Sequence, residues 1–364
     1  MKKTLAVLAV LGACTANASA QSHVTFYGII DAGLTRVIND SGNGNNGTRT
    51  TLESGQMQTS RWGFRGEESL GGGMKARFGV EGLLANDTGG AGIPTGTPSR
   101  TSLFDREATV GLSGGFGSVS LGRQNVLGMN STVMADPMGM AFAPTNPNVL
   151  FSVMNSAPAY GAYGANNGGS ALRQSNSIRY TSPYYKNFGF ALMRAFGEQP
   201  GSVEKSKYEG VAGFYHTGPF GASAVYARMK NVTASEELKS HVFGARYTRS
   251  RVTLRSTYSA NRVDTTRRKI SVAGVGVDVP LAPAVTLTGA VYHTRHTGNA
   301  RNGSRQVIAI AKYALSKRST AYASIGHART DNVVTASQIN LAQGFVSVGS
   351  DSAQRFTTGM LHFF

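Results

Sequence analysis

The chain has 364 residues, a mean hydropathy of −0.17, and 36 Lys and Arg against 19 Asp and Glu. After the first 20 residues it has no run of roughly 20 apolar residues, which excludes a helical membrane protein. Charged residues are 15% of the chain, against about 25% in an average soluble protein. The 46 glycines are nearly twice the usual share of ~7%. These proportions argue against a soluble helical enzyme, and the aromatic residues argue against a disordered chain.

Residues 1–20 have the form of a secretory signal peptide. Lys2 and Lys3 precede an apolar run over 5–11, and an A-x-A motif ends at Ala20. Cleavage after Ala20 is therefore expected, which leaves residues 21–364 as the exported chain.

A second interpretation of this segment stays open. Residues 11–14, Leu-Gly-Ala-Cys, resemble a lipoprotein signal that would acylate Cys14. If cleavage occurs after Ala20 instead, the single cysteine leaves with the signal. The exported chain then has no thiol for a disulfide or a metal site, and we expect no cofactor.

The exported chain consists mainly of segments of about ten residues that alternate apolar and polar positions. In 252–261 the even positions are mostly apolar and the odd positions are polar or charged. Segments 61–65 and 75–84 show the same division, and residues two apart share one face of a strand. This pattern is typical of a transmembrane β-barrel, although a soluble barrel has the same periodicity. The export signal favours the membrane.

The connections between these segments alternate between short and long. Short ones are expected at 71–73, 114–117, 186–187, 218–221, 250–251, 282–284 and 317–318. Long ones are expected near 39–55, 87–102, 126–174, 199–207, 232–238, 264–269, 299–304 and 332–352. The segments number about sixteen; fourteen or eighteen stay open because 188–198 and 305–331 lack clean alternation. Since hydrocarbon does not tolerate an open sheet edge, 22–37 should pair with 353–364.

Several segments resemble one family of bacterial proteins. Residues 21–31 (QSHVTFYGIID), 60–73 (SRWGFRGEESLGGG), 117–123 (GSVSLGR) and the terminal Phe364 are similar to those of the Gram-negative general porins of beta-proteobacterial type. The resemblance implies a homotrimer of sixteen-stranded antiparallel barrels in the cell outer membrane. Each barrel would be a water-filled channel for passive diffusion of small hydrophilic solutes and ions. The terminal aromatic residue would be the signal for insertion by the barrel-assembly machinery.

The same resemblance implies that the third long loop folds into each pore as a constriction. Residues 126–174 are far longer than an ordinary connection, and structureless loops of that length are usually functional. The loop is rich in Met, Pro, Asn, Gly and Ala and holds few charges. A disordered surface loop is the alternative, but its methionines and phenylalanines favour burial against a barrel wall.

Six residues are expected at the constriction. Residues whose motifs match the family's arginine cluster are Arg61, Arg106 and Arg173, with Arg123 near the root of the loop; Glu81 and Asp136 would oppose them. Guanidinium groups stay charged at any working pH, and in a narrow pore they concentrate anions. The sequence therefore predicts anion preference and small anionic or polar solutes.

One feature argues against the placement of Arg106. Its alternating partners Ala108, Val110 and Leu112 are apolar, so simple alternation places Arg106 on the outward face. A solvated outer loop or a rim contact is the alternative location for each arginine.

Other functions fit the sequence less well. Nucleic-acid binding is disfavoured because the basic residues are scattered and the chain is exported. No metalloprotease motif, nucleophile elbow or phosphate-binding loop is present, so we expect no enzyme. A surface β-rich binding protein without a pore remains the alternative. The expected partners are a homotrimer, outer-membrane lipid and lipopolysaccharide.

Overall fold

The computed structural model describes residues 23–40, 47–92, 94–95, 100–142, 145–152, 163–165, 172–298, 302–337 and 339–364. The predicted signal peptide lies outside these residues. Among the described residues there is no helix with the length and apolar character needed to cross a bilayer.

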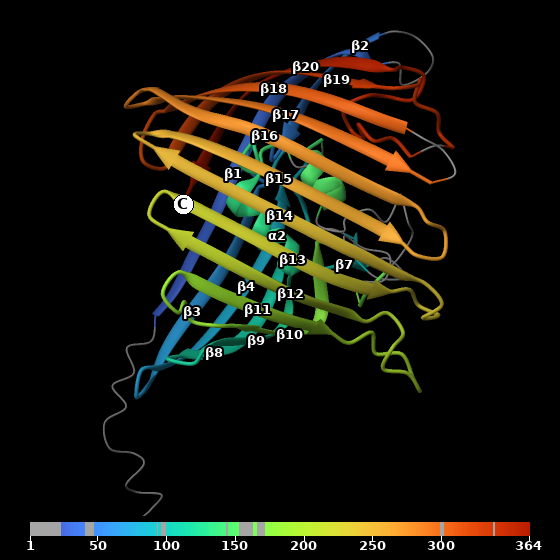
Figure 1. The fold of residues 1–364 in the computed structure, drawn as a ribbon. Helices are drawn as coiled ribbons and strands as arrows, with labels where there is room; N and C mark the ends of the chain where they lie inside the picture. The colour runs from blue at the N-terminus through green and yellow to red at the C-terminus, as the bar shows by residue number, and fades with distance from the viewer. Residues whose placement is uncertain are drawn as a thin grey trace, which may run out of the picture.

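The chain forms a closed antiparallel barrel of sixteen strands (Figure 1). Fifteen of the sixteen positions around the barrel wall are each occupied by a single strand. The remaining position is occupied by two strands that follow one another in the sequence. The strands in barrel order are β1 (His23–Asp40), β2 with β3 (Gly47–Ser54, Arg61–Gly71), β4 (Met74–Ala85), β8 (Glu107–Gly114), β9 (Gly117–Asn125), β10 (Arg173–Thr181), β11 (Phe188–Ala195), β12 (Tyr208–Thr217), β13 (Phe220–Lys230), β14 (Glu237–Arg249), β15 (Val252–Val263), β16 (Lys269–Ala282), β17 (Val285–Thr297), β18 (Asn302–Ala314), β19 (Ser319–Thr330) and β20 (Ser352–Phe363). Short strands β5 (Gly90–Ala91), β6 (Pro94–Thr95) and β7 (Arg100–Thr101) lie between β4 and β8.

The first and last strands close the barrel. β1 pairs with β20 from Ile29 opposite Phe363 to Ile38 opposite Gln354. The backbones of Gly28 and Phe364 exchange two hydrogen bonds of 3.2 and 3.1 Å. A Cβ atom at Gly28 would lie 2.2 Å from the Phe364 ring, so this contact requires glycine. The predicted pairing and strand number are confirmed, because a membrane sheet must leave no edge unpaired.

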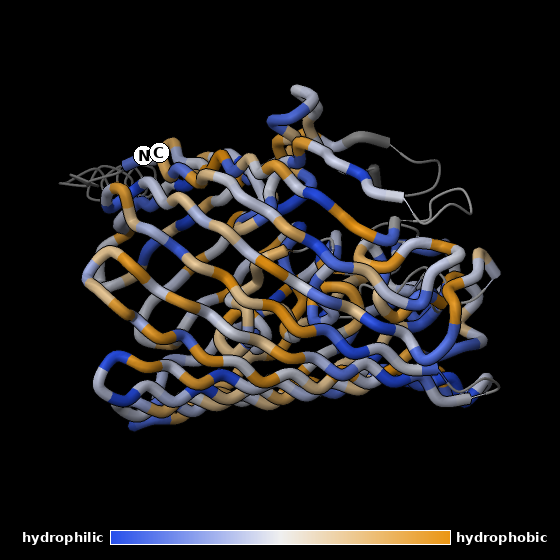
Figure 2. The backbone as a smooth tube through the Cα atoms, turned by 90° about the horizontal axis from the view of Figure 1, so that it is seen from above, coloured by the Kyte–Doolittle hydropathy of each residue, from blue (hydrophilic) through white to orange (hydrophobic). Residues whose placement is uncertain are grey.

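The two faces of the wall differ in exposure along long strands such as β13, β17 and β18. In β18, Val307 is 53% exposed while its neighbour Ile308 is 4% exposed. Hydrophobic and hydrophilic residues alternate along the strands in Figure 2. Exposed apolar residues on the outside of a closed barrel suit a lipid environment.

Part of the long segment between β9 and β10 lies inside the barrel (Figure 1). Its helix α2 (Leu127–Ala135) and helical turn η1 (Asn148–Ser152) pack against β13 to β16. The hydroxyls of Ser131 and Ser223 are 2.5 Å apart. Ala135 lies against Gly244, where a Cβ atom would approach it to 2.7 Å. Small residues on the inner wall therefore make room for this segment.

Candidate functional site: the charged lumen

One carboxylate on the inner wall holds two arginines. Arg61 begins β3 and Glu81 lies near the end of the adjacent strand β4. The Arg61 Nε atom is 3.3 Å from Glu81 Oε2, and the Arg106 Nε atom is 2.6 Å from Glu81 Oε1. The Tyr27 hydroxyl donates a 3.2 Å hydrogen bond to the same carboxylate. The three predicted residues Arg61, Glu81 and Arg106 thus form one cluster.

Arg106 reaches this cluster because it precedes its strand. β8 begins at Glu107, so the alternation that places Val110 on the outer face does not extend to Arg106. The Arg106 backbone donates a 3.1 Å hydrogen bond to the Glu81 carbonyl. Asp105 fixes the same turn by accepting a 2.9 Å hydrogen bond from the Leu83 backbone. Simple alternation therefore gave the wrong face for Arg106.

The other two arginines lie where the long segment leaves and rejoins the wall. Arg123, near the end of β9, donates hydrogen bonds of 2.5 Å to the Asp105 carbonyl and 2.9 Å to the Ser175 hydroxyl. Arg173 begins β10 and is 4% exposed. The charges of Arg106 and Arg123 both act on Arg173, as do those of Asp105 and Glu81. Arg173 is thus a covered fixed charge beside the cluster.

Asp136 lies elsewhere, at the end of α2, and is 0% exposed. Its oxygens accept hydrogen bonds from the backbone of Met138 (3.1 Å) and Met140 (2.7 Å). The amides of Asn146 (3.1 Å) and Asn148 (2.7 Å) also donate to it.

The Tyr292 hydroxyl of β17 adds a fifth donor to Asp136, at 3.0 Å. Asn148 in turn donates a 2.7 Å hydrogen bond to Thr257 of β15. Burial raises the pKa of the Asp136 carboxyl, and these hydrogen bonds oppose that shift. The sequence analysis grouped Asp136 with Glu81, but the structure shows no contact between Asp136 and any of the predicted arginines among the described residues. Through these hydrogen bonds, Asp136 holds the inner segment against the barrel wall.

A second charged cluster lies on the wall that the inner segment covers. The Asp278 carboxylate of β16 is 2.8 Å from Arg255 Nη1 of β15 and 3.6 Å from Lys312 Nζ of β18. Thr288 donates a 2.5 Å hydrogen bond to it. A Cβ atom at Gly139 would lie 3.3 Å from Arg255 Nη1, so the inner segment passes this cluster. Sequence reasoning missed Asp278: alternation in β15 marks Arg255 as inward, but β16 is apolar on both faces and gives no such signal for Asp278.

Together these groups give the lumen an excess of positive charge. Near Arg61, Arg106, Arg123 and Arg173 there are three acidic side chains among the described residues, Glu81, Asp105 and Glu107, the last of which lies opposite Glu81. They are fewer than the four guanidinium groups, which stay ionised. Between low-dielectric walls this imbalance raises the local concentration of anions.

Comparison with known proteins agrees with this geometry. The family model described as "Gram-negative porin" matches residues 4–333. The chain belongs to the Gram-negative porin family. The porin is located in the outer membrane, and the apolar exterior of its barrel suits the lipid there.

Curated relatives match over part of their length. Outer membrane porin protein 32 of Delftia acidovorans is 36% identical over 233 residues, which cover 63% of this porin and 60% of the relative. An outer membrane porin protein of Bordetella pertussis is 31% identical over 207 residues, covering 54% and 48%. The matched part thus spans about half to three-fifths of these relatives.

Solved structures show the same fold over nearly the whole chain. The "Anion-selective porin from Comamonas acidovorans" has a TM-score of 0.76 at 24% identity, covering 94% of this porin and 100% of that chain. The trimer form of OmpT from Vibrio cholerae has a TM-score of 0.66 at 16% identity, covering 94% and 99%. At these identities the likeness concerns the fold.

Proposed function

We propose that this porin is a channel, not an enzyme, and that it conducts small hydrophilic solutes and ions passively with a preference for anions. The observation that carries the proposal is the cluster of Arg61 and Arg106 on the single carboxylate of Glu81. A fixed positive field in a narrow, water-filled section favours anions without binding them tightly. The similar structure from Comamonas acidovorans is described as an anion-selective porin, which supports the same preference.

The segment 126–174 is proposed as the constriction. Its described part fills the side of the lumen next to β13–β16, and the arginine cluster lies on β3, β4 and the turn before β8. The open path would then run between a wall that carries charge and a segment that narrows the section. Arg123 and Arg173 would add to the field from the root of the segment.

We further propose a homotrimer of exported chains 21–364, assembled after removal of residues 1–20. The outer faces of β1, β3, β4 and β8 support a subunit contact. Their exposed outward residues are apolar through the middle of the wall, namely Phe26, Ile30, Phe64, Phe78, Val110 and Leu112. The trimer form of the Vibrio relative has the same fold. Outer-membrane lipid and lipopolysaccharide would cover the remaining face. Phe364, held against β1, would be the signal that the assembly machinery reads.

Planar-bilayer recording of the purified protein under a KCl gradient tests this proposal. Stepwise currents in groups of three, with a reversal potential toward chloride, are expected. A potassium-directed reversal potential would refute the role of the arginines while leaving the channel intact. No current from folded, heat-modifiable protein would refute the channel and favour a binding protein.

A further inference from the structure

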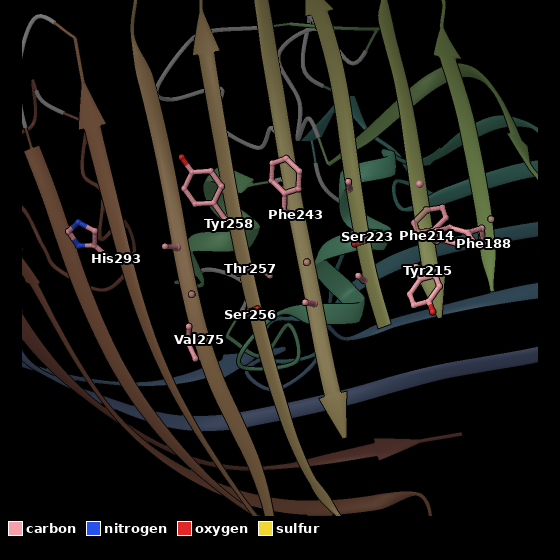
Figure 3. A pocket seen from close by; sticks show the side chains of 18 of the residues that line it. Phe188, Phe214, Tyr215, Ser223, Phe243, Ser256, Thr257, Tyr258, Val275 and His293 are labelled. Carbon is pink, nitrogen blue, oxygen red and sulfur yellow. The ribbon is translucent and has the colours of Figure 1, made fainter. Parts of the chain in front are cut away.

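The inner segment is held from two sides of the lumen. On one side α2 lies behind the wall shown in Figure 3, where the Ser223 hydroxyl contacts it. Thr257 of the same wall accepts a hydrogen bond from Asn148. On the other side, the Phe142 backbone donates a 2.6 Å hydrogen bond to the carbonyl of Gln56, which precedes β3. This second anchor belongs to strands at the start of the chain and is separate from Asp136.

Gln56 belongs to a bend that leaves the sheet. β2 pairs with β1 as far as Ser54, and β3 pairs with β1 from Arg61 onward. The residues between them, 55–60, lie opposite only residues 30–31 of β1, so the extra chain has to leave the ladder. We call residues 55–60 the strap. Because Gln56 is 1% exposed and reaches the inner segment, the strap projects into the lumen.

A buried carboxylate of β1 fixes the strap. Asp31 is 0% exposed and accepts hydrogen bonds of 2.6 Å from the backbones of Met57 and Gln58. The Tyr322 hydroxyl of β19 donates a further 2.6 Å hydrogen bond to Asp31. Hydrogen bonds to a buried charged group are among the strong ones in proteins. The strap is therefore a rigid point on the wall where the barrel closes.

One arginine of the last strand binds the strap. Arg355 of β20 is 6% exposed, and its Nη2 atom donates a 3.0 Å hydrogen bond to Gln56 Oε1. The same guanidinium forms an ion pair with Glu53 at the end of β2. Arg355 and Gln56 are 299 residues apart in the sequence. Closure of the barrel therefore creates this contact.

The last long connection, residues 332–352, also enters the lumen. Its Leu341 and Phe345 are 0% and 2% exposed. The Leu341 carbonyl accepts a 2.9 Å hydrogen bond from Ser304, an inward residue of β18. A Cβ atom on Gly326 of β19 would lie 2.9 Å from the Phe345 ring. This connection therefore covers the inner wall of β18 and β19.

Arg355 lies between the two lumenal segments. While its Nη2 atom binds Gln56, its Nη1 atom donates a 3.3 Å hydrogen bond to the Gly344 carbonyl of the last connection. Phe142, Phe345 and Arg355 line one hollow of about 10 Å³, which is room for about one water molecule. The inner segment, the strap and the last connection thus meet at a single guanidinium group.

We propose that Arg355 is a positioning residue that holds the inner segment, through the strap, and the last connection at one point, and so sets the width of the pore. A guanidinium group presents several donors in a rigid plane and can bind acceptors on different segments at once. A lysine ammonium keeps the charge but loses this fixed geometry. The inference rests on the proposed role of 126–174 as the constriction.

Limited proteolysis of the purified protein in detergent tests the coupling. Chymotrypsin cleaves after Phe142 and Phe345, and both are buried, so the cleavage rates report local opening of the two segments. Arg355→Lys and Gln56→Ala are compared with the wild type. Arg329→Lys is the matched control, because Arg329 is exposed on the outward face of β19. Single-channel conductance and the reversal potential under a KCl gradient are recorded for each protein.

Arg355→Lys should accelerate cleavage at both sites at least about fivefold, because hydrogen bonds to two segments are lost together. Conductance should rise about 1.5-fold with an unchanged reversal potential, since the charge is kept. Gln56→Ala leaves the bond between Arg355 and Gly344 in place. It should accelerate cleavage after Phe142 about threefold and leave cleavage after Phe345 unchanged. Arg329→Lys should match the wild type, and all variants should keep the heat-modifiable migration of a closed barrel.

Three results would overturn the proposal. The first is wild-type cleavage in Arg355→Lys, or acceleration at one site only. The second is equal acceleration at both sites in Gln56→Ala, which would indicate general loosening of the barrel. The third is faster cleavage in Arg355→Lys with wild-type conductance, which would separate these contacts from the pore width.

Two readouts keep this inference separate from the proposed function. Current and reversal potential of the wild type test the anion-preferring channel, whereas the cleavage pattern of the variants tests the coupling. If Arg355→Lys does not fold, Gln56→Ala decides the question, and unchanged cleavage after Phe142 in that variant would refute the role of the strap.

Discussion

The two sides of the lumen are built on different principles. On the side of β3, β4 and the turn before β8, the inward side chains are large and charged, and Arg61 and Arg106 share Glu81. On the side of β13–β16, inward positions such as Ser223 and Gly244 are small, and the inner segment packs against them. The first side therefore supplies charge, whereas the second supplies mainly shape, although the cluster of Asp278 with Arg255 and Lys312 also lies there. Selectivity and pore size should respond to different substitutions.

The largest effect is expected from Asp136→Asn, which leaves the charged wall untouched. An amide nitrogen in place of one carboxylate oxygen would face two or three of the five buried donors. Docking of the inner segment should weaken by on the order of 3–5 kcal/mol, because each unpaired buried donor costs about 1–3 kcal/mol. We expect higher and noisier single-channel conductance and faster proteolysis within 127–152.

The exposed Asp87→Asn provides the matched control, since Asp87 lies in the turn after β4. It should leave conductance and proteolysis unchanged. Wild-type conductance in Asp136→Asn would show that this carboxylate does not hold the segment, and the division between the two walls would fail.

The next effect concerns ion selectivity. Arg61→Gln with Arg106→Gln removes both guanidinium groups from Glu81 and leaves that carboxylate unopposed. The chloride-to-potassium permeability ratio should fall by about three- to tenfold, because fixed charges in a confined section set the local ion concentration. The reversal potential under a KCl gradient measures this ratio, and conductance should change much less.

Arg123→Gln is the comparison for this double variant. Its guanidinium binds the Asp105 carbonyl and the Ser175 hydroxyl, so the change in reversal potential should be smaller. An equal change would mean that the field comes from the root of the inner segment instead of the Glu81 cluster.

A smaller change in the opposite direction is expected for Glu81→Gln. Loss of the carboxylate leaves Arg61 and Arg106 without their counter-charge, so the permeability ratio should rise by about twofold toward chloride. Glu67→Gln is the matched control, because Glu67 pairs with Lys75 and Arg77 farther along the same two strands. A shift toward potassium in Glu81→Gln would contradict the assignment of charge to this wall.

The smallest effect is expected for Ser223→Ala on the shape-forming wall. It removes the hydrogen bond to Ser131 and should weaken docking of α2 by about 0.5–1.5 kcal/mol. Proteolysis within 127–152 should accelerate slightly, with the reversal potential unchanged. Ser271 faces outward on β16, so Ser271→Ala should leave the rate of proteolysis within 127–152 unchanged. If Ser271→Ala accelerates proteolysis as much as Ser223→Ala does, the effect comes from the barrel as a whole.

Much of the barrel could be predicted because its rules are local. Alternation marks which side chains face lipid, and the requirement that every backbone group be paired forces the first strand onto the last. The pairing of Arg61 with Glu81 also follows, because both lie at inward positions of one hairpin. The two segments without clean alternation, 188–198 and 305–331, also form strands. Without them, the backbone groups at the edges of the neighbouring strands would be unpaired.

What the sequence by itself determined is therefore the closed barrel, its lipid-facing exterior and the charge on the hairpin of β3 and β4. The tertiary structure decided the rest. Arg106 turns inward only because the turn before β8 is fixed by Asp105 and the Glu81 carbonyl. Asp136 is buried because closure brings Tyr292, 156 residues away, against the inner segment. Alternation describes one strand and its neighbours, whereas these contacts form across a lumen that exists only once the barrel has closed.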